Sequence, residues 1–112
     1  MINEQILSAL APLNVPIYFM EAEENNDSIY IIFGTTGVDD SFYEDDDATA
    51  EVTRVAITLW YNAEEAIGIG EKIRELKRIM KSNNFIRLSE KDSKDGNFFG
   101  RSFYFSKLQY VE

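Results

Sequence analysis

The sequence predicts an α+β domain: a mostly antiparallel sheet of about five strands with two helices packed on one face, in the order α-β-β-β-α-β-β. Two segments carry apolar residues at helical spacing, and five are rich in β-branched and aromatic residues. An Asp-Gly pair links the last two of these five. Hairpin-linked strands with helices on one face form this architecture. The 112 residues, 45% of them hydrophobic, are enough for one domain, 1–112, with its own core.

The first predicted helix spans residues 2–11, where apolar residues recur at helical spacing before a proline. The second spans 63–83 and begins after Asn62, a good N-cap. It ends at Asn83 and Asn84, which tolerate the left-handed conformation that closes a helix. Its apolar stripe consists of Ile69, Ile73, Leu76 and Met80.

The predicted strands are clearest at 52–61, where Val55, Ile57 and Leu59 alternate with polar or small residues. The other strands are expected at 14–22, 29–36, 85–91 and 97–111. We expect a core in which Ile31, Phe33, Ile57, Leu59, Phe103 and Phe105 lie beneath Ile6, Leu10, Ile73, Leu76 and Met80 of the helices.

Charge is divided between the two halves of the chain. Residues 1–53 contain twelve acidic residues and no Lys or Arg, a charge of -12. Residues 54–112 contain eleven basic and eight acidic residues, a charge of +3, which gives the net charge of -9. Such asymmetry bears on encounters with partners rather than on the fold. It allows one copy to dock head to tail against another.

Seven carboxylates fall within "DDSFYEDDDATAE", residues 39–51, which contain no basic residue. We expect a mobile acidic loop, because this segment has too little apolar area to offset the entropy of ordering. An EF-hand loop is excluded, since counting from Asp40 the sixth position is Asp45 instead of glycine. A two-metal site needs carboxylates from several rigid elements, whereas these are contiguous. We therefore expect no metal and no cofactor.

The composition argues against catalysis. The chain has neither Cys nor His, which removes thiolate chemistry, the commonest metal ligand and the usual general base. The segment "IGIGEK", residues 67–72, lacks the spacing of a phosphate-binding loop, and no serine has a base partner at motif spacing. We expect a protein that is not an enzyme.

A membrane location is also not expected. No run of residues has the length and apolarity of a transmembrane helix. The start, "MINEQILSAL", lacks the basic region of a signal peptide. We expect a protein made and at first kept in the cytoplasm.

Four cations of the second helix, at 74, 77, 78 and 81, emerge from the side away from its apolar stripe. They either face solvent or contact an external partner. Nucleic acid is an unfavourable partner, because the domain as a whole repels phosphates. The acidic segment of another copy is the densest source of countercharge.

Five segments carry a resemblance to a known family: "NVPIYF" (14–19), "SIYIIFG" (28–34), "YEDDDATAEVTRVAITLWYN" (43–62), "KIRELKRIMKSNNFIR" (72–87) and "GRSFYFSK" (100–107). In this combination the chain resembles, over nearly its whole length, the tail completion (tail terminator) proteins of long-tailed bacteriophages and prophages of Gram-positive hosts. The resemblance implies a hexameric ring at the head end of the tail tube, which stops tube growth and joins the tail to the head connector. It implies no enzymatic activity.

The resemblance also implies a location and partners. The protein would assemble in the host cytoplasm and lie at the head–tail junction of the virion, against tube and connector proteins. DNA would pass through the lumen without specific binding. A ring needs one patch to meet a different patch on the next copy. The expected patches are Asp39, Asp40, Phe42, Tyr43, Glu44, Asp45, Asp46 and Asp47 on one side, and Arg74, Lys77, Arg78 and Lys81 on the other.

Two other functions compete with this one. An acidic interaction domain or nucleic-acid mimic that inhibits a DNA-binding enzyme would need carboxylates spread along a helix or strand at phosphate-like spacing. A small carboxylate–metal enzyme is disfavoured by the missing histidine and the missing glycine-rich loops. Native mass spectrometry separates the first two functions: rings support assembly, and a monomer that binds a DNA enzyme supports mimicry.

Overall fold

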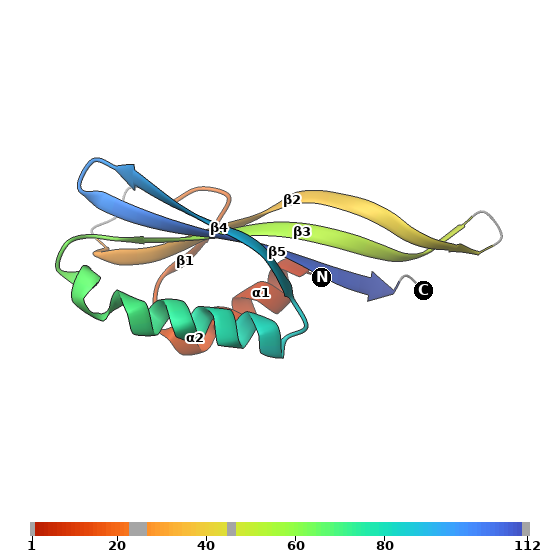
Figure 1. Ribbon diagram of the computed structural model, residues 1–112, viewed down its shortest axis with the longest axis horizontal. Helices are drawn as coiled ribbons and strands as arrows, with labels where there is room; N and C mark the ends of the chain where they lie inside the picture. Colours follow the sequence, from red (N-terminus) through yellow and green to blue (C-terminus); the bar gives the residue numbers. More distant parts are fainter. Residues whose placement is uncertain (1, 23–26, 45–46, 111–112) are drawn as a thin grey trace.

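The computed structural model describes residues 2–22, 27–44 and 47–110, with side chains described outside 40–49. It has the expected α+β architecture, a mostly antiparallel five-stranded sheet with two α-helices on one face (Figure 1). The elements are α1 (Ile2–Leu10), a 3-10 turn (Ala11–Leu13), β1 (Ile17–Phe19), β2 (Ile29–Glu44), β3 (Asp47–Tyr61), a second 3-10 turn (Glu65–Gly68), α2 (Ile69–Ser82), β4 (Ile86–Asp95) and β5 (Phe98–Tyr110).

The strand order across the sheet is β1-β2-β3-β5-β4, with β3 in the centre. β1 pairs with β2 in parallel, and the other three pairings are antiparallel. The last hairpin is tighter than expected, because β4 continues to Asp95 and only Gly96 and Asn97 form the turn. Gly96 has a φ of 58°, a backbone conformation that favours glycine in a two-residue hairpin turn.

The ends of the second helical segment follow the predicted signals. The Oδ1 atom of Asn62 accepts hydrogen bonds from the N–H groups of Glu64 and Glu65 at 3.1 and 3.2 Å. The chain first makes a 3-10 turn, and α2 begins only at Ile69, because two glycines lower the helix propensity here. Asn84, with a φ of 67°, closes the helix in the left-handed conformation.

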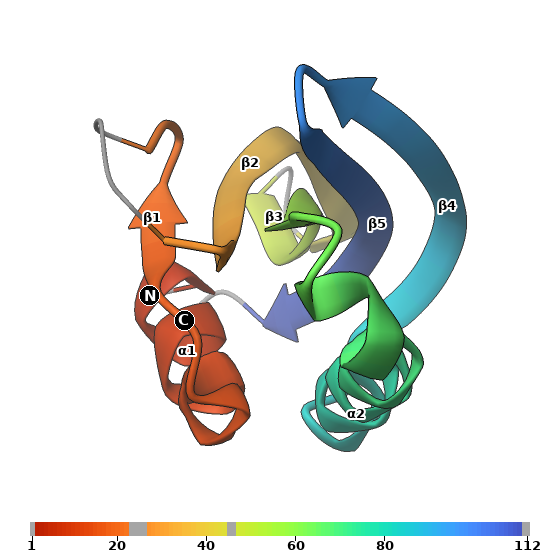
Figure 2. The same ribbon diagram turned by 90° about the vertical axis from the view of Figure 1, so that its left-hand side faces the viewer.

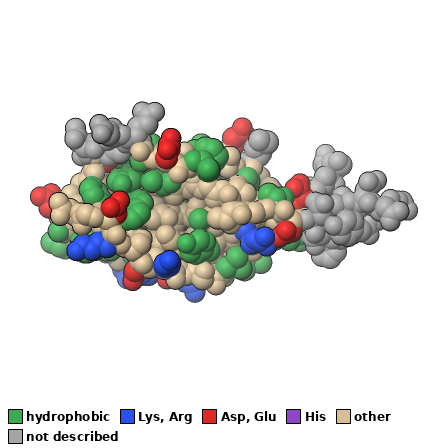
Figure 3. All heavy atoms as spheres, turned by 90° about the horizontal axis from the view of Figure 1, so that it is seen from above, with side chains coloured by type: hydrophobic (Ala, Val, Ile, Leu, Met, Phe, Trp, Pro, Cys, Tyr) green, Lys and Arg blue, Asp and Glu red, His purple; other side chains and the backbone are tan. Residues whose placement is uncertain are grey.

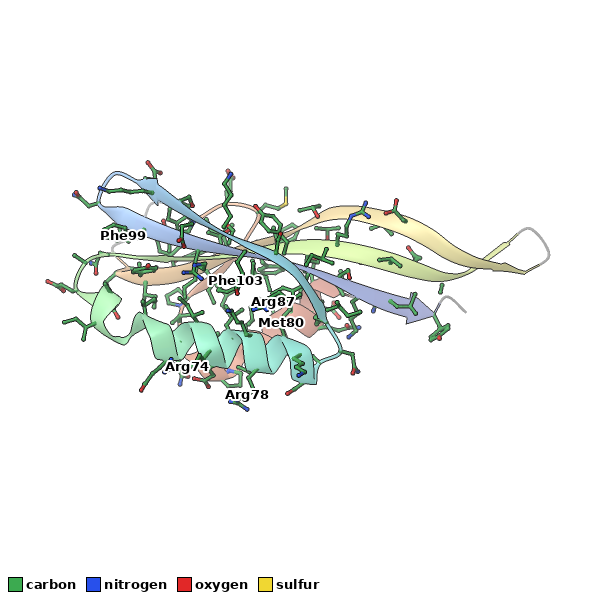
Figure 4. All side chains as sticks on the ribbon, viewed as in Figure 1. Arg74, Arg78, Met80, Arg87, Phe99 and Phe103 are labelled. Atoms are coloured by element: carbon green, nitrogen blue, oxygen red, sulfur yellow. The ribbon has the colours of Figure 1, made fainter. Side chains whose placement is uncertain are left out.

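The predicted core is confirmed. The sheet contributes Ile31, Phe33, Ile57, Leu59, Phe103 and Phe105, and the helices contribute Ile6, Leu10, Leu76 and Met80, all at most 1% exposed. Ile73 is partly buried against this cluster. Met80 and Phe103 lie in the layer between α2 and the sheet (Figure 4). The period-two alternation therefore assigned the strand faces correctly.

Both helices lie on the same face of the sheet, α1 on the side of β1 and α2 on the side of β4 (Figure 2). Lys72 of α2 donates a hydrogen bond from Nζ to the carbonyl oxygen of Leu13, at 2.6 Å, and so links the two helical segments. Lys107 of β5 donates to Oε1 of Gln5 at 2.8 Å, and its Nζ lies 4.8 Å from the centroid of the Phe85 ring. These contacts hold both helices to the sheet.

The expectation of a loop over residues 39–51 is wrong for 39–44 and 47–51, while Asp45 and Asp46 lie outside the described residues. β2 continues to Glu44, β3 begins at Asp47, and these two residues are still paired. β5 ends opposite Ala50, so beyond this point β2 and β3 continue without it. They project from the sheet as a two-stranded extension (Figure 1). We call residues 39–44 and 47–51 the acidic arm.

The arm escaped prediction because residues 39–51 are mostly acidic or small. No alternation of apolar residues then marks it in the sequence. Its backbone groups are still satisfied by pairing, which charged side chains do not prevent. The arm also accounts for the elongated shape of 55 × 25 × 22 Å and a radius of gyration of 15.4 Å, where a compact chain of this length would have about 13 Å.

In the described part of the chain, no helix covers the other face of the sheet, which carries several groups of hydrophobic side chains (Figure 3). The rings of Tyr30 and Phe98 lie 5.7 Å apart on this face. Trp60 lies over Gly100, where a Cβ atom would come within 2.8 Å of the indole ring. Glycine is needed at this position so that the tryptophan can lie close to the sheet.

Truncating Leu59 or Phe103 to Ala should lower the free energy of unfolding by about 3–5 kcal/mol, because each side chain is buried and its loss leaves a cavity. Chemical denaturation followed by circular dichroism measures this loss. Leu88→Ala is the matched control: this residue of β4 is 53% exposed, and its truncation should cost about 0.5 kcal/mol or less. A core truncation that costs less than about 1 kcal/mol would contradict the assigned strand faces.

Candidate functional site

Three surface features stand out: the acidic arm, the basic face of α2, and a cleft beside that face. Among the residues that the structure describes, no group of three or more acidic side chains could hold a metal ion. None of the described helices has the length and apolarity needed to cross a membrane.

The acidic side of the predicted interface is described only in part. Asp45 and Asp46 lie outside the described residues, as do the side chains of Asp40, Phe42, Tyr43, Glu44 and Asp47. Asp39 is described, and its Oδ2 lies 2.5 Å from Nη1 of Arg54 on the facing strand. Arg54 lies over Gly37, where a Cβ atom would stand 2.9 Å from the guanidinium group. The glycine therefore leaves room for an ion pair at the base of the arm.

The basic side is only partly available to a partner. Arg74, Arg78 and Lys81 are exposed, and Arg74 and Arg78 lie on the side of α2 turned away from the sheet (Figure 4). Among the described residues, Arg74 and Lys81 form no ion pair, and Arg78 has a single contact with Glu75 at 4.0 Å. The expectation that all four cations of α2 face solvent or an external partner is wrong for Lys77.

Lys77 is bound within the protomer. Its Nζ lies 2.5 Å from Oε1 of Glu90 on β4. Glu90 also accepts hydrogen bonds from Nη1 of Arg87 at 3.2 Å and from Nη1 of Arg101 at 3.1 Å. Nε of Arg101 in turn donates to Asp92 at 2.5 Å. This ionic cluster ties α2 to β4 and β5, a contact that helix periodicity alone could not reveal.

The cations around Glu90 lower its pKa. Partial burial acts in the opposite direction, because it penalises the charged carboxylate. The hydrogen bond from Lys77 and the charges of Lys77, Arg87 and Arg101 outweigh that penalty. The pKa of Arg101 is raised, chiefly by its hydrogen bond to Asp92. Both changes favour the charged forms that hold the cluster together.

A cleft of about 560 Å³ opens between the end of α2 and the start of β4. We call it the α2–β4 cleft. Its apolar lining includes the buried rings of Phe85 and Phe105. Four cations line the rest of it: Lys77, Arg78, Lys81 and Arg87. The cleft thus combines an apolar interior with a positively charged rim.

Sequence reasoning missed three of the residues that line this cleft, Phe85, Ile86 and Arg87. One signal could have found them: only three residues separate α2 from β4. So short a connection keeps the last helical turn and the first strand residues together. The sequence could not show that Ile86 remains 64% exposed at the edge of the cleft.

Within one protomer, the structure does not bring the arm and the basic face together. The arm continues past the helix-covered part of the sheet and away from α2 (Figure 1). The described ion pairs of α2 join it to β4 or stay within the helix, and none reaches the arm. A contact between these two surfaces is therefore a contact between copies.

Comparison of the sequence with models of known protein families and with curated proteins finds no match. The function is therefore argued from the charges and surfaces described above.

Replacing Glu90 with Gln should lower stability at neutral pH by about 1 kcal/mol, because partly exposed ion pairs contribute about 0.2–1 kcal/mol each. The pKa of Glu90 is lower in the folded protein than in the unfolded chain. The stabilisation is therefore present above the carboxyl's ordinary pKa and is lost as the pH falls through the lowered one. Urea denaturation between pH 7 and pH 3 measures it.

The wild-type and Glu90→Gln stability curves should converge at low pH. Curves that stay parallel across this range would show that the cluster does not stabilise the fold. Asp95→Asn, at the exposed end of β4, is the control for loss of one carboxylate.

Proposed function

We propose that this protein is a structural virion assembly protein that caps the phage tail tube as a ring and joins the tail to the head connector. One observation carries the proposal: an acidic arm projects from one part of the protomer while exposed cations line another, and the two do not meet within it. The resemblance of five sequence segments to tail terminator proteins supplies the biological setting.

The separation of charge suits a heterologous interface. In such an interface one patch meets a different patch on the next copy, and a ring closes when the rotation between copies allows it. The segment 39–51 contains seven acidic residues, five of them in the arm, and α2 presents Arg74, Arg78 and Lys81 to solvent. Each exposed pair contributes only about 0.2–1 kcal/mol. Assembly of this kind depends on several pairs and weakens as salt increases.

The proposed role is mechanical. The ring ends the growth of the tail tube, contacts tube and connector proteins, and surrounds the DNA path. A protein with a net charge of -9 gains little from phosphate groups, so DNA can pass without being held. No catalytic step is part of the proposal.

The second candidate, a nucleic-acid mimic, gains support from the shape of the arm. Five of the seven carboxylates belong to residues of two paired strands and not of a loop: Asp39, Asp40, Glu44, Asp47 and Glu51. Residues four apart in a strand, such as Asp40 and Glu44 or Asp47 and Glu51, have backbone positions about 13 Å apart, so charge recurs along the arm. A mimic would act as a monomer against a basic enzyme groove, whereas the assembly protein meets other copies of itself.

Native mass spectrometry and negative-stain electron microscopy of the purified chain at low salt should show rings, with the hexamer as the main species. Rings that dissociate as salt is raised support the electrostatic contact, because salt screens exposed pairs. A protein that stays monomeric at all salt concentrations and protein concentrations would refute the ring and leave the mimic as the better function.

Changing both Arg74 and Arg78 to Glu should abolish ring formation while the protomer keeps its fold, because both side chains are exposed and outside the core. Adding Asp45→Lys and Asp46→Lys to the same chain should restore rings in part. Lys91→Glu with Lys94→Glu changes the net charge equally on exposed β4 positions and is the matched control. If the Arg74/Arg78 variant still forms rings at low salt, the basic face of α2 is not the contact.

A further inference from the structure

We propose that the α2–β4 cleft is the socket for the acidic arm of the next copy, and that an aromatic side chain of the arm, from the Phe42–Tyr43 pair, enters it. This inference rests on the proposed ring and identifies the residues that join one copy to the next. It adds Phe85, Ile86 and Arg87 to the interface, and it treats Lys77 as part of the socket wall rather than as a free cation.

The chemistry of the cleft defines what it can accept. The rings of Phe85 and Phe105 give it an apolar interior, and both are nearly inaccessible in the protomer, at 4% and 1% exposure. Ile86, at 64% exposure, adds apolar surface at the edge. Four cations surround this apolar part, while the nearby acids Glu75 and Glu90 offset two of them. The ligand that fits is an apolar or aromatic group flanked by negative charges.

A phosphate group by itself does not match this chemistry. It would use the cations but leave Ile86 in contact with water. An aliphatic ligand would use the apolar surface but leave Lys81 without countercharge. An acidic peptide with an aromatic residue uses both parts, since burial of one aromatic ring contributes more than a single exposed ion pair.

The acidic arm has this composition. Residues 39–47 contain six carboxylates together with adjacent Phe42 and Tyr43. In the printed sequence no other stretch of nine residues has as many acidic residues. The arm also projects beyond the helix-covered part of the sheet (Figure 1), so it can reach a neighbour without disturbing its own core.

The wall of the cleft is preorganised. Lys77 belongs to α2 and Arg87 to β4, and both side chains contact Glu90, at 2.5 and 3.2 Å respectively. This shared carboxylate holds α2 and β4 at a constant separation before any partner arrives. A preorganised site loses less conformational entropy on binding, which favours a socket over a flat charged surface.

The experiment uses the absence of cysteine from the chain. Single-cysteine variants of the full chain are made at Phe42, at Tyr43, at Ile86 and at Ile67. Ile67 lies before the start of α2 and is 95% exposed, so it is the matched control for Ile86. Variants are mixed in pairs at low salt, oxidised mildly, and analysed by non-reducing gel and intact mass spectrometry. A disulfide forms only when the two Cβ atoms come within about 3.5–4.5 Å.

The mixture of Ile86→Cys with Phe42→Cys or with Tyr43→Cys should give a disulfide-linked heterodimer. Both arm positions are tested because either member of the Phe42–Tyr43 pair could enter the cleft. The yield should exceed that of either variant alone, and that of the corresponding mixture with Ile67→Cys, by at least about tenfold. The heterodimer should disappear when salt is raised to about 1 M, where the Debye length is only about 3 Å.

Charge variants test whether the cations of the cleft contribute to the same contact. Lys81→Glu should reduce the heterodimer yield several-fold when introduced into the Ile86→Cys chain. Lys91→Glu makes the same change in net charge on an exposed β4 position outside the cleft and should leave the yield unchanged. Equal effects of the two changes would mean that overall charge, and not the cleft, controls the contact.

The outcomes separate this inference from the proposed function. Rings without any 42–86 or 43–86 disulfide overturn the socket and leave the ring intact. Strong homodimers of Phe42→Cys alone would show that arms meet arms, which overturns the socket as well. Protein that never oligomerises, with native circular dichroism, overturns both the socket and the ring.

Discussion

The pairing of β2 with β3 governs the arrangement of this molecule. β3 is the central strand, hydrogen-bonded to β2 on one side and to β5 on the other, so every other element is placed relative to it. Where β5 and the helices accompany this pair, Ile57, Leu59 and their neighbours bury one face of the sheet. Where they stop, the pair continues as the acidic arm. One pairing therefore supplies both the core and the projecting surface.

The cluster around Glu90 divides the positive charges of α2 into two groups with different roles. Lys77 contacts Glu90 inside the protomer, together with Arg87 and Arg101, and it holds the helix against β4. Arg74, Arg78 and Lys81 stay on the surface. The same carboxylate contacts Lys77 and Arg87, two of the cations that line the α2–β4 cleft. In the proposed assembly, stability of the protomer and binding of the next copy would therefore involve a common set of side chains.

The distribution of charge is the basis of the proposed association between copies. Opposite charges that could attract each other are kept in separate places, since the arm projects away from α2. Among the described ion pairs, Asp39 of the arm is paired with Arg54, and none joins the arm to α2. In a closed assembly each arm would meet the cations of a neighbour, and the apolar cleft would add a contact that salt screens little. The protomer thus folds as a domain, while exposed cations of α2 have no ion pair with the described part of the arm.

The sequence by itself determined the fold class, the core and the end of α2. Alternation in 52–61 assigned the strand faces, helical spacing found the buried side of α2, and Asn84 marked its end. Asn62 caps the 3-10 turn that precedes α2, so the start of α2 at Ile69 differs from the predicted one. These features can be predicted because burial of one face gives a periodic pattern of apolar residues, and capping depends on residues close together in the sequence. Segregation of charge between the two halves was equally visible, since it needs only counting.

The tertiary structure alone decided what the charged residues do. The acidic stretch has the composition of a loop, yet it pairs as two strands, because backbone hydrogen bonds form irrespective of side-chain charge. Lys77 belongs to the polar side of its helix by periodicity, yet β4 lies beneath it and supplies Glu90. The α2–β4 cleft likewise arises where a helix end and a strand start meet. Such contacts depend on distance in space, which a pattern along the chain does not encode.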